Sequence, residues 1–168
     1  MPLDDDRWHD LETAYRGSCD DLITRLSDAY VGDFIEDFLG VTVNEVAHQG
    51  DHSDSIFAVV PHFVRLSRVC RDARSLDLLI QAGLMCQIAD ELPCPAPVED
   101  EYRMAREIGL ADLRDRLSAQ LDQDAFRYAL GATAGFAGYG RLTDILDKFE
   151  FLEVDECCPT CGRYVGLD

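Results

Sequence analysis

The sequence lacks any hydrophobic run of the roughly 18 to 20 residues that a membrane-spanning helix needs. It also lacks the marks of an export signal, because the segment from Met1 to Asp6 is acidic and has neither a basic nor an apolar stretch. We therefore expect a cytoplasmic protein without a membrane partner. Hydrophobic residues still make up 47% of the 168 residues, which argues against disorder and favours a packed globular domain.

Basic residues are scarce. The chain has 15 lysines and arginines against 33 aspartates and glutamates, a formal net charge of −18. A surface of this sign repels the phosphate backbone, so we exclude nucleic acid as a partner. The same charge attracts basic proteins, and we predict a basic protein partner. The alternative is that the charge serves solubility alone.

Residues 61–80 reverse this charge. They carry four arginines at positions 65, 68, 71 and 74, a spacing that places basic side chains along one helical face. Such a stripe can bind an acidic partner or a phosphate. We favour ion pairs with carboxylates on neighbouring helices, because the chain has these in excess.

Recognisable catalytic motifs are absent. The sequence contains no P-loop, no GxGxxG, no GxSxG and no Cys/His/Asn set with the spacing of a known enzyme family. We therefore predict that the protein is not an enzyme.

Helical periodicity is present along most of the chain and predicts an all-α fold of roughly eight helices stacked as antiparallel pairs. The helices are expected around residues 7–15, 22–29, 34–50, 56–66, 76–88, 104–121, 126–136 and 142–149. Pro61 is expected to kink the fourth of these or to begin a new helix, and Gly109 to break or bend the sixth. Residues 1–150 form the helical domain, and residues 151–168 form a Cys-rich tail.

Two histidines provide one candidate site. His48 and His52 are four residues apart, so on a continuous helix they share one face, as zinc-binding histidines do. Asp51 or Asp54 then supplies an oxygen ligand. This reading makes the protein a metal-dependent enzyme.

The surrounding residues favour a structural interpretation of the same segment. Gly50 is expected to end a helix between the two histidines, and Gln49 stands beside His48 where a metalloprotease needs a glutamate base. Histidine and glutamine also serve as hydrogen-bond partners for free groups at helix ends. We therefore interpret this segment as a helix–turn–helix junction.

The tail carries a second candidate site. Cys158-x-x-Cys161-Gly resembles one zinc knuckle, in which a turn lets two thiolates face one ion. We predict a structural zinc bound by Cys158 and Cys161, with Cys157 as a further ligand. Cys94, a histidine or a second chain can complete the four ligands, and the last case makes the protein a zinc-linked homodimer. The alternatives are free thiols and a redox pair.

Three segments together resemble the pattern of a bacterial group of HEAT-repeat-like proteins. They are Trp8-x-x-Leu11-x-x-Ala14-Tyr15, His48-Gln49-Gly50 and Ala58-Val59-Val60-Pro61-His62-Phe63-Val64. The resemblance covers residues 8–64 and implies an α/α stack that binds other proteins. Some small helical-repeat proteins of this kind resemble immunity proteins that neutralise toxins. The chain departs from the pattern at residues 51–54, where small and aromatic residues are usual and Asp-His-Ser-Asp stands instead.

Overall fold

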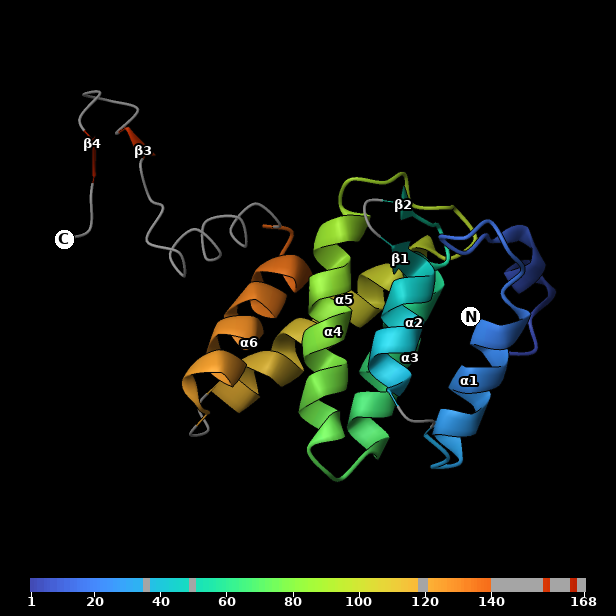
Figure 1. The fold of residues 1–168 in the computed structure, drawn as a ribbon, viewed down its shortest axis with the longest axis horizontal. Helices are drawn as coiled ribbons and strands as arrows, with labels where there is room; N and C mark the ends of the chain where they lie inside the picture. Colours follow the sequence, from blue (N-terminus) through green and yellow to red (C-terminus); the bar gives the residue numbers. More distant parts are fainter. Residues whose placement is uncertain (35–36, 49–50, 118–120, 140–155, 158–163, 166–168) are drawn as a thin grey trace.

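The computed structural model describes residues 1–34, 37–48, 51–117, 121–139, 156–157 and 164–165, with the backbone alone at 48, 51–52, 156–157 and 164–165. This part of the chain is all-α, as predicted, with six packed α-helices (Figure 1). The elements are a 3-10 helix η1 (Asp6–Asp10), α1 (Asp20–Tyr30), α2 (Phe38–Val46), β1 (Ala47–His48), β2 (Asp51–His52), α3 (Ile56–Val69), α4 (Arg74–Ala89), α5 (Glu99–Leu117), α6 (Gln123–Phe136), β3 (Glu156–Cys157) and β4 (Tyr164–Val165).

Helix α4 lies at the centre of the bundle. It packs between α3 and α6, and α5 crosses behind these three helices and contacts each of them (Figure 1). Helices α1 and α2 lie on the α3 side. Helix α3 is the most enclosed element, with every residue from Ile56 to Val64 buried. A continuous apolar run of this length therefore forms a helix that is surrounded by the rest of the fold.

Small residues allow α4 and α6 to approach closely. A Cβ at Gly83 would stand 2.5 Å from the Ala132 carbonyl oxygen, and a Cβ at Gly135 would overlap the Gly83 carbonyl oxygen. The backbones therefore meet at a separation that larger side chains prevent. The small residues of α6 between positions 129 and 135 make this close contact possible.

The predicted break at Gly109 is wrong, because α5 is continuous from Glu99 to Leu117. A Cβ at Gly109 would overlap the Phe136 ring, so the glycine makes room for an aromatic side chain from α6. Pro61 likewise lies inside α3 and begins no new helix. Its ring removes one backbone donor, but the buried flanks of α3 hold the helix together on both sides of it.

The predicted helix over residues 7–15 is mostly wrong. Only η1 forms, and Leu11 is already extended, at φ −101° and ψ 149°. The Asp5 side chain accepts from the Arg7 amide and caps η1. Further along, the Ala14 amide donates to the Glu45 carbonyl at 2.7 Å, so this segment bonds to α2 instead of to itself.

The predicted helix up to Gly50 is also too long. Helix α2 ends at Val46, and β1 and β2 then form a short antiparallel hairpin. The Val46 carbonyl accepts from both the amide and the hydroxyl of Ser53, at 3.1 and 3.0 Å, which closes the hairpin. The junction that joins α2 to α3 therefore contains a pair of short antiparallel strands. A search for helical periodicity does not detect strand pairing of this length.

In the tail, β3 and β4 pair antiparallel, with Glu156 opposite Val165 and Cys157 opposite Tyr164. A strand at Tyr164–Val165 was expected beside the cysteines. The helix predicted over residues 142–149 lies outside the described residues, as do Cys158 and Cys161.

Candidate functional site

The histidine hypothesis depended on a helix through His48 and His52, and that helix is absent. The register of the hairpin pairs Ala47 with His52 and His48 with Asp51. The two histidines therefore do not occupy positions four apart on one helical face, which was the geometry that made them resemble zinc ligands. Asp54, the other proposed ligand, instead accepts a hydrogen bond from the Glu12 amide at 2.8 Å.

His62, the third histidine of this region, has a structural role on α3. Its side chain is 2% exposed, with Nδ1 2.9 Å from the Tyr30 hydroxyl and Nε2 3.0 Å from the Met1 carbonyl oxygen. Burial, together with a smaller contribution from the Arg65 charge, lowers the pKa of His62 to about 3. The neutral ring therefore donates from Nε2 and accepts at Nδ1, and it connects α1 and the N-terminal segment to α3.

Three of the four arginines in the basic stripe form ion pairs, as predicted. Arg65 donates to Glu101 at 2.6 Å, and Arg68 makes two bonds to Asp112, at 2.6 and 2.9 Å; both acceptors lie on α5. The Arg68 guanidinium holds the pKa of the Asp112 carboxyl below its usual value. Arg74 pairs with its near neighbour Asp72. The stripe therefore holds α3 and α5 together and is largely occupied.

Among the side chains that the structure describes, no group of three or more His, Cys, Asp or Glu residues is placed to hold a metal ion. The predicted zinc ligands Cys158 and Cys161 lie outside the described residues, and Cys157 is described only as backbone in β3. The zinc site therefore stays a prediction.

The cysteines with described side chains are free thiols, namely Cys19, Cys70, Cys86 and Cys94. Burial raises the pKa of Cys19 to about 11 and that of Cys86 to about 12. Both stay protonated near neutral pH, so neither supplies a thiolate nucleophile. Both side chains are small buried members of the core.

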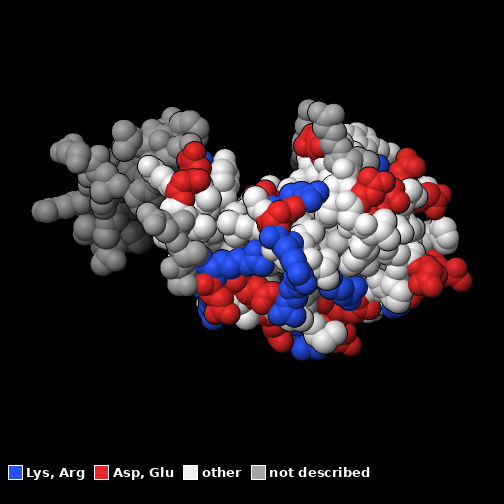
Figure 2. Space-filling model, turned by 90° about the horizontal axis from the view of Figure 1, so that it is seen from below, with Lys and Arg blue, Asp and Glu red and all other residues white. Residues whose placement is uncertain are grey.

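Exposed acidic side chains gather at one end of the molecule, which we call the acidic end and define as the described residues between Asp4 and Asp37. Figure 2 shows acidic side chains along the side where α1 lies, and arginines towards the middle of the same face. Eight acidic residues of this end are exposed: Asp4, Asp6, Asp10, Glu12, Asp20, Asp21, Asp33 and Asp37. Other exposed carboxylates, such as those of Glu91, Asp100 and Asp124, lie on other elements, so the acidic end holds part of the negative charge that composition predicts.

Two of the arginines at the acidic end bind groups of the protein itself. Arg7 bonds to Asp5 and to the Pro97 carbonyl, both at 2.7 Å. Arg25 forms an ion pair with Glu45 of α2. The Arg25 and Glu45 side chains are 16% and 17% exposed, so this pair lies largely between the helices. These arginines therefore attach the acidic end to the core and leave its outer carboxylates unneutralised.

Apolar groups are exposed among these carboxylates. Tyr15 is 58% exposed and Val31 is 82% exposed, while Tyr30 presents part of its ring although its hydroxyl is bonded to His62. Exposed aromatic and aliphatic side chains of this kind serve as anchors in protein interfaces. Sequence reasoning missed them, since Tyr15 was assigned to the apolar face of a helix that does not form.

No helix of the described residues is long and apolar enough to cross a membrane. Comparison with known protein families, with curated protein sequences and with solved structures finds no match to this chain. The fold that the structure shows is therefore an all-α arrangement of six packed helices, and the resemblance to HEAT-repeat-like proteins stays a prediction.

Proposed function

We propose that this protein is a non-enzymatic binding module whose acidic end receives a basic protein. The observation that carries the proposal is that residues 4–37 expose eight carboxylates together with the apolar side chains of Tyr15 and Val31. Carboxylates of one sign attract a basic partner over a distance and orient it, while apolar anchors supply short-range affinity.

The resemblance to immunity-like helical proteins adds a more specific expectation. The partner is then a basic toxin, which the acidic end covers and neutralises. An immunity protein needs no catalytic group, and this agrees with the lack of a recognisable catalytic motif in the sequence. The proposal includes a cytoplasmic location, where such a toxin must be held inactive.

The experiment is to express the chain together with the product of the adjacent reading frame and to measure their complex by isothermal titration calorimetry. The Asp10→Asn/Asp21→Asn double variant is expected to weaken the complex about tenfold. Its matched control, Glu91→Gln/Asp124→Asn, removes the same charge from exposed positions on other elements and is expected to bind normally. Equal weakening by both variants, or an affinity insensitive to salt, would contradict the proposal.

The zinc hypothesis is tested separately. We propose, from the sequence, that Cys158 and Cys161 with Cys157 bind one structural zinc ion, within one chain or shared by two. Elemental analysis is expected to find zinc in the purified protein and to find it lost in Cys158→Ser but kept in His52→Ala. A dimer that becomes a monomer on chelation would indicate the shared site. Zinc lost only in His52→Ala would instead favour the metal-dependent enzyme.

A further inference from the structure

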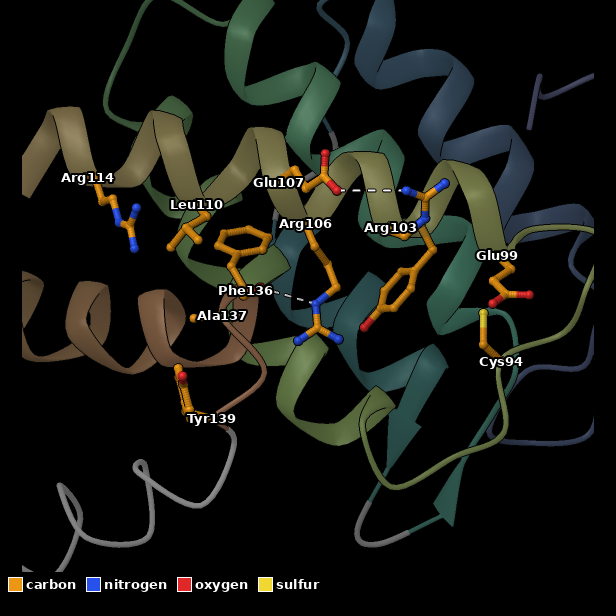
Figure 3. A pocket seen from close by; sticks show the side chains of 11 residues that line it. Cys94, Glu99, Arg103, Arg106, Glu107, Leu110, Arg114, Phe136, Ala137 and Tyr139 are labelled. Atoms are coloured by element: carbon orange, nitrogen blue, oxygen red, sulfur yellow. Dashed lines mark hydrogen bonds and ion pairs between the residues drawn. The ribbon is translucent and has the colours of Figure 1, made fainter.

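A groove runs along α5 beside the C-terminal end of α6, and Figure 3 shows the side chains that line it. Its volume is about 630 Å³, which lies within the range of ligand-binding pockets. The α5 wall extends from Glu99 to Arg114, about 22 Å at the helical rise of about 1.5 Å per residue. The groove is therefore long and narrow, a shape that suits an extended chain better than a compact molecule.

One end of the groove combines an apolar surface with an arginine. Leu110, Phe136 and Tyr139 line this end, and Arg114 extends from α5 beside them (Figure 3). Arg114 is exposed and has no ion pair or hydrogen bond with any residue that the structure describes. A guanidinium in this position is free to bind a carboxylate through two parallel hydrogen bonds.

The other arginines of the groove already have partners. Arg106 donates to Asp90 at 2.5 Å and to the Gly135 carbonyl at 2.7 Å, so it holds the end of α6 in place. Arg103 lies within ion-pair distance of Asp100 and Glu107, at 2.9 and 3.9 Å. Among the arginines described in this groove, Arg114 is therefore the one whose guanidinium is available to bind a ligand.

Tyr102 also lines the groove. Its side chain is 6% exposed, and its hydroxyl is enclosed by the protein without a hydrogen-bond partner in the described part of the chain. Burial raises the pKa of Tyr102, and the Cys86 thiol nearby raises it further. The hydroxyl is therefore neutral, and an occupant of the groove does not reach it.

The polar wall decides between a hydrocarbon chain and a peptide. A hydrocarbon in the groove would remove the Arg103 and Glu107 side chains from water without replacing their hydrogen bonds to it. A peptide backbone carries a donor and an acceptor at every residue and can satisfy these groups. At about 3.3 Å per residue, a length of about 22 Å corresponds to six or seven extended residues.

We propose that this groove binds a short extended peptide with its carboxylate end at Arg114. The peptide places an apolar side chain on Leu110 and Phe136 beside that carboxylate, and its backbone bonds to the Arg103 and Glu107 side chains. A basic side chain at its other end faces Glu99, which is exposed and has no ion pair among the described residues. This site is separate from the acidic end and does not depend on the function proposed for it.

The test uses two fluorescein-labelled hexapeptide mixtures and the full-length protein. One mixture has lysine first, leucine fifth and a C-terminal glutamate with a free carboxylate, with alanine, serine or tyrosine at the remaining positions. The other has the same residues in reverse order and therefore the same composition and charge. Fluorescence anisotropy is expected to show that the forward mixture binds at least tenfold more tightly than the reversed one.

Variants then assign the binding to the groove. Arg114→Glu is expected to weaken binding of the forward mixture at least tenfold, and replacing the C-terminal glutamate by lysine in the peptide should recover part of the loss. Arg71→Glu, which makes the same charge change at an exposed position outside the groove, should bind like the unaltered protein. Tyr102→Phe is a second control and should bind the forward mixture like the unaltered protein, because the hydroxyl is enclosed and makes no bond to the peptide.

Three results would overturn the proposal. Equal affinity for the forward and reversed peptides would show that the groove does not select the direction of the peptide chain, which the proposal requires. If Arg114→Glu and Arg71→Glu weaken binding equally, the affinity depends on the net charge of the protein and not on the groove. The absence of saturable binding of both mixtures up to millimolar protein shows that the groove takes no peptide of this kind.

Discussion

The contact between α4 and α6 and the attachment of the acidic end to the core stabilise this molecule in different ways. The first depends on shape, since glycines at positions 83 and 135 bring two helix backbones together with no space for a methyl group. The second depends on polar pairs between distant segments, such as Arg25 with Glu45 and His62 with both Tyr30 and Met1.

This difference predicts different sensitivities. A close backbone contact fails when volume is added, but it has no titratable group and is insensitive to pH. A buried polar link fails when one partner is removed, because the other is left unsatisfied away from water. Variants of the two regions should therefore differ in how much they lower the free energy of unfolding and in how that loss depends on pH.

The largest effect is expected from Gly135→Ala. The added methyl group overlaps the Gly83 carbonyl of α4, so the helices must move apart. We expect a loss of about 3 kcal/mol or more in the free energy of unfolding, measured by urea denaturation. Gly17→Ala is the control, since its nearest new contact would be Thr13 Oγ1 at 3.4 Å, and it should change stability by less than about 1 kcal/mol. Similar midpoints for both variants would show that the backbones are not closely packed.

His62→Ala is expected to have the next largest effect. It leaves the Tyr30 hydroxyl and the Met1 carbonyl without their partner and opens a cavity beside Trp8. We expect a loss of about 2 to 3 kcal/mol. Tyr30→Phe removes one hydrogen bond only and should cost about 1 kcal/mol. Hydrogen exchange should also show faster opening of α1 than of α6 in His62→Ala; equal acceleration of both helices would contradict a local link.

The pH dependence of the free energy of unfolding should also reveal the burial of His62. The unfolded chain binds a proton on His62 near pH 6.5, whereas the folded protein resists it down to about pH 3. Its contribution is therefore fully present above pH 6.5 and is lost as the pH falls. Between pH 6 and pH 5, above the range in which most carboxylates titrate, we expect a decrease of about 1.4 kcal/mol per pH unit. His62→Gln, which cannot titrate, should lack this slope, whereas Gly135→Ala should keep it.

The smallest effect on stability is expected from Asp10→Asn/Asp21→Asn. Both carboxylates are exposed, and Asp21 adds only a favourable interaction with the N-terminal end of α1. We expect a change of less than about 1 kcal/mol in urea denaturation. A larger loss would mean that the outer carboxylates of the acidic end stabilise the fold, which would weaken the case that they serve binding.

Features that depend on local sequence were predictable. Helices α1, α4 and α6 follow from apolar residues at helical spacing and from the turns at Gly32 and Gly138, where φ is positive. The ion pairs of Arg65 and Arg68 followed from the excess of acidic residues. The acidic surface was predictable as a net charge, but the positions of its exposed carboxylates were not, because composition does not say which residues lie close together in the fold.

The errors arose where distant residues decide local structure. The segment after η1 leaves the helical path where the Glu12 amide bonds to Asp54 and the Ala14 amide bonds to Glu45 of α2. Helix α2 ends at Val46, whose carbonyl accepts hydrogen bonds from Ser53. A periodicity pattern covers only neighbouring residues, so it does not reveal hydrogen-bond partners that are distant in the sequence. The histidine pair failed for the same reason, since its geometry depended on a helix that tertiary contacts replaced with a hairpin.

By itself, the sequence determined that this chain folds as a set of amphipathic helices with a strongly acidic surface, because both properties are sums over local residues. Only the tertiary structure decided that Gly109 accommodates Phe136, that His62 is a buried link, and that Tyr102 lies in a groove with its hydroxyl unpaired. Each of these depends on which helix lies opposite, and that choice is made by the packing of the whole core.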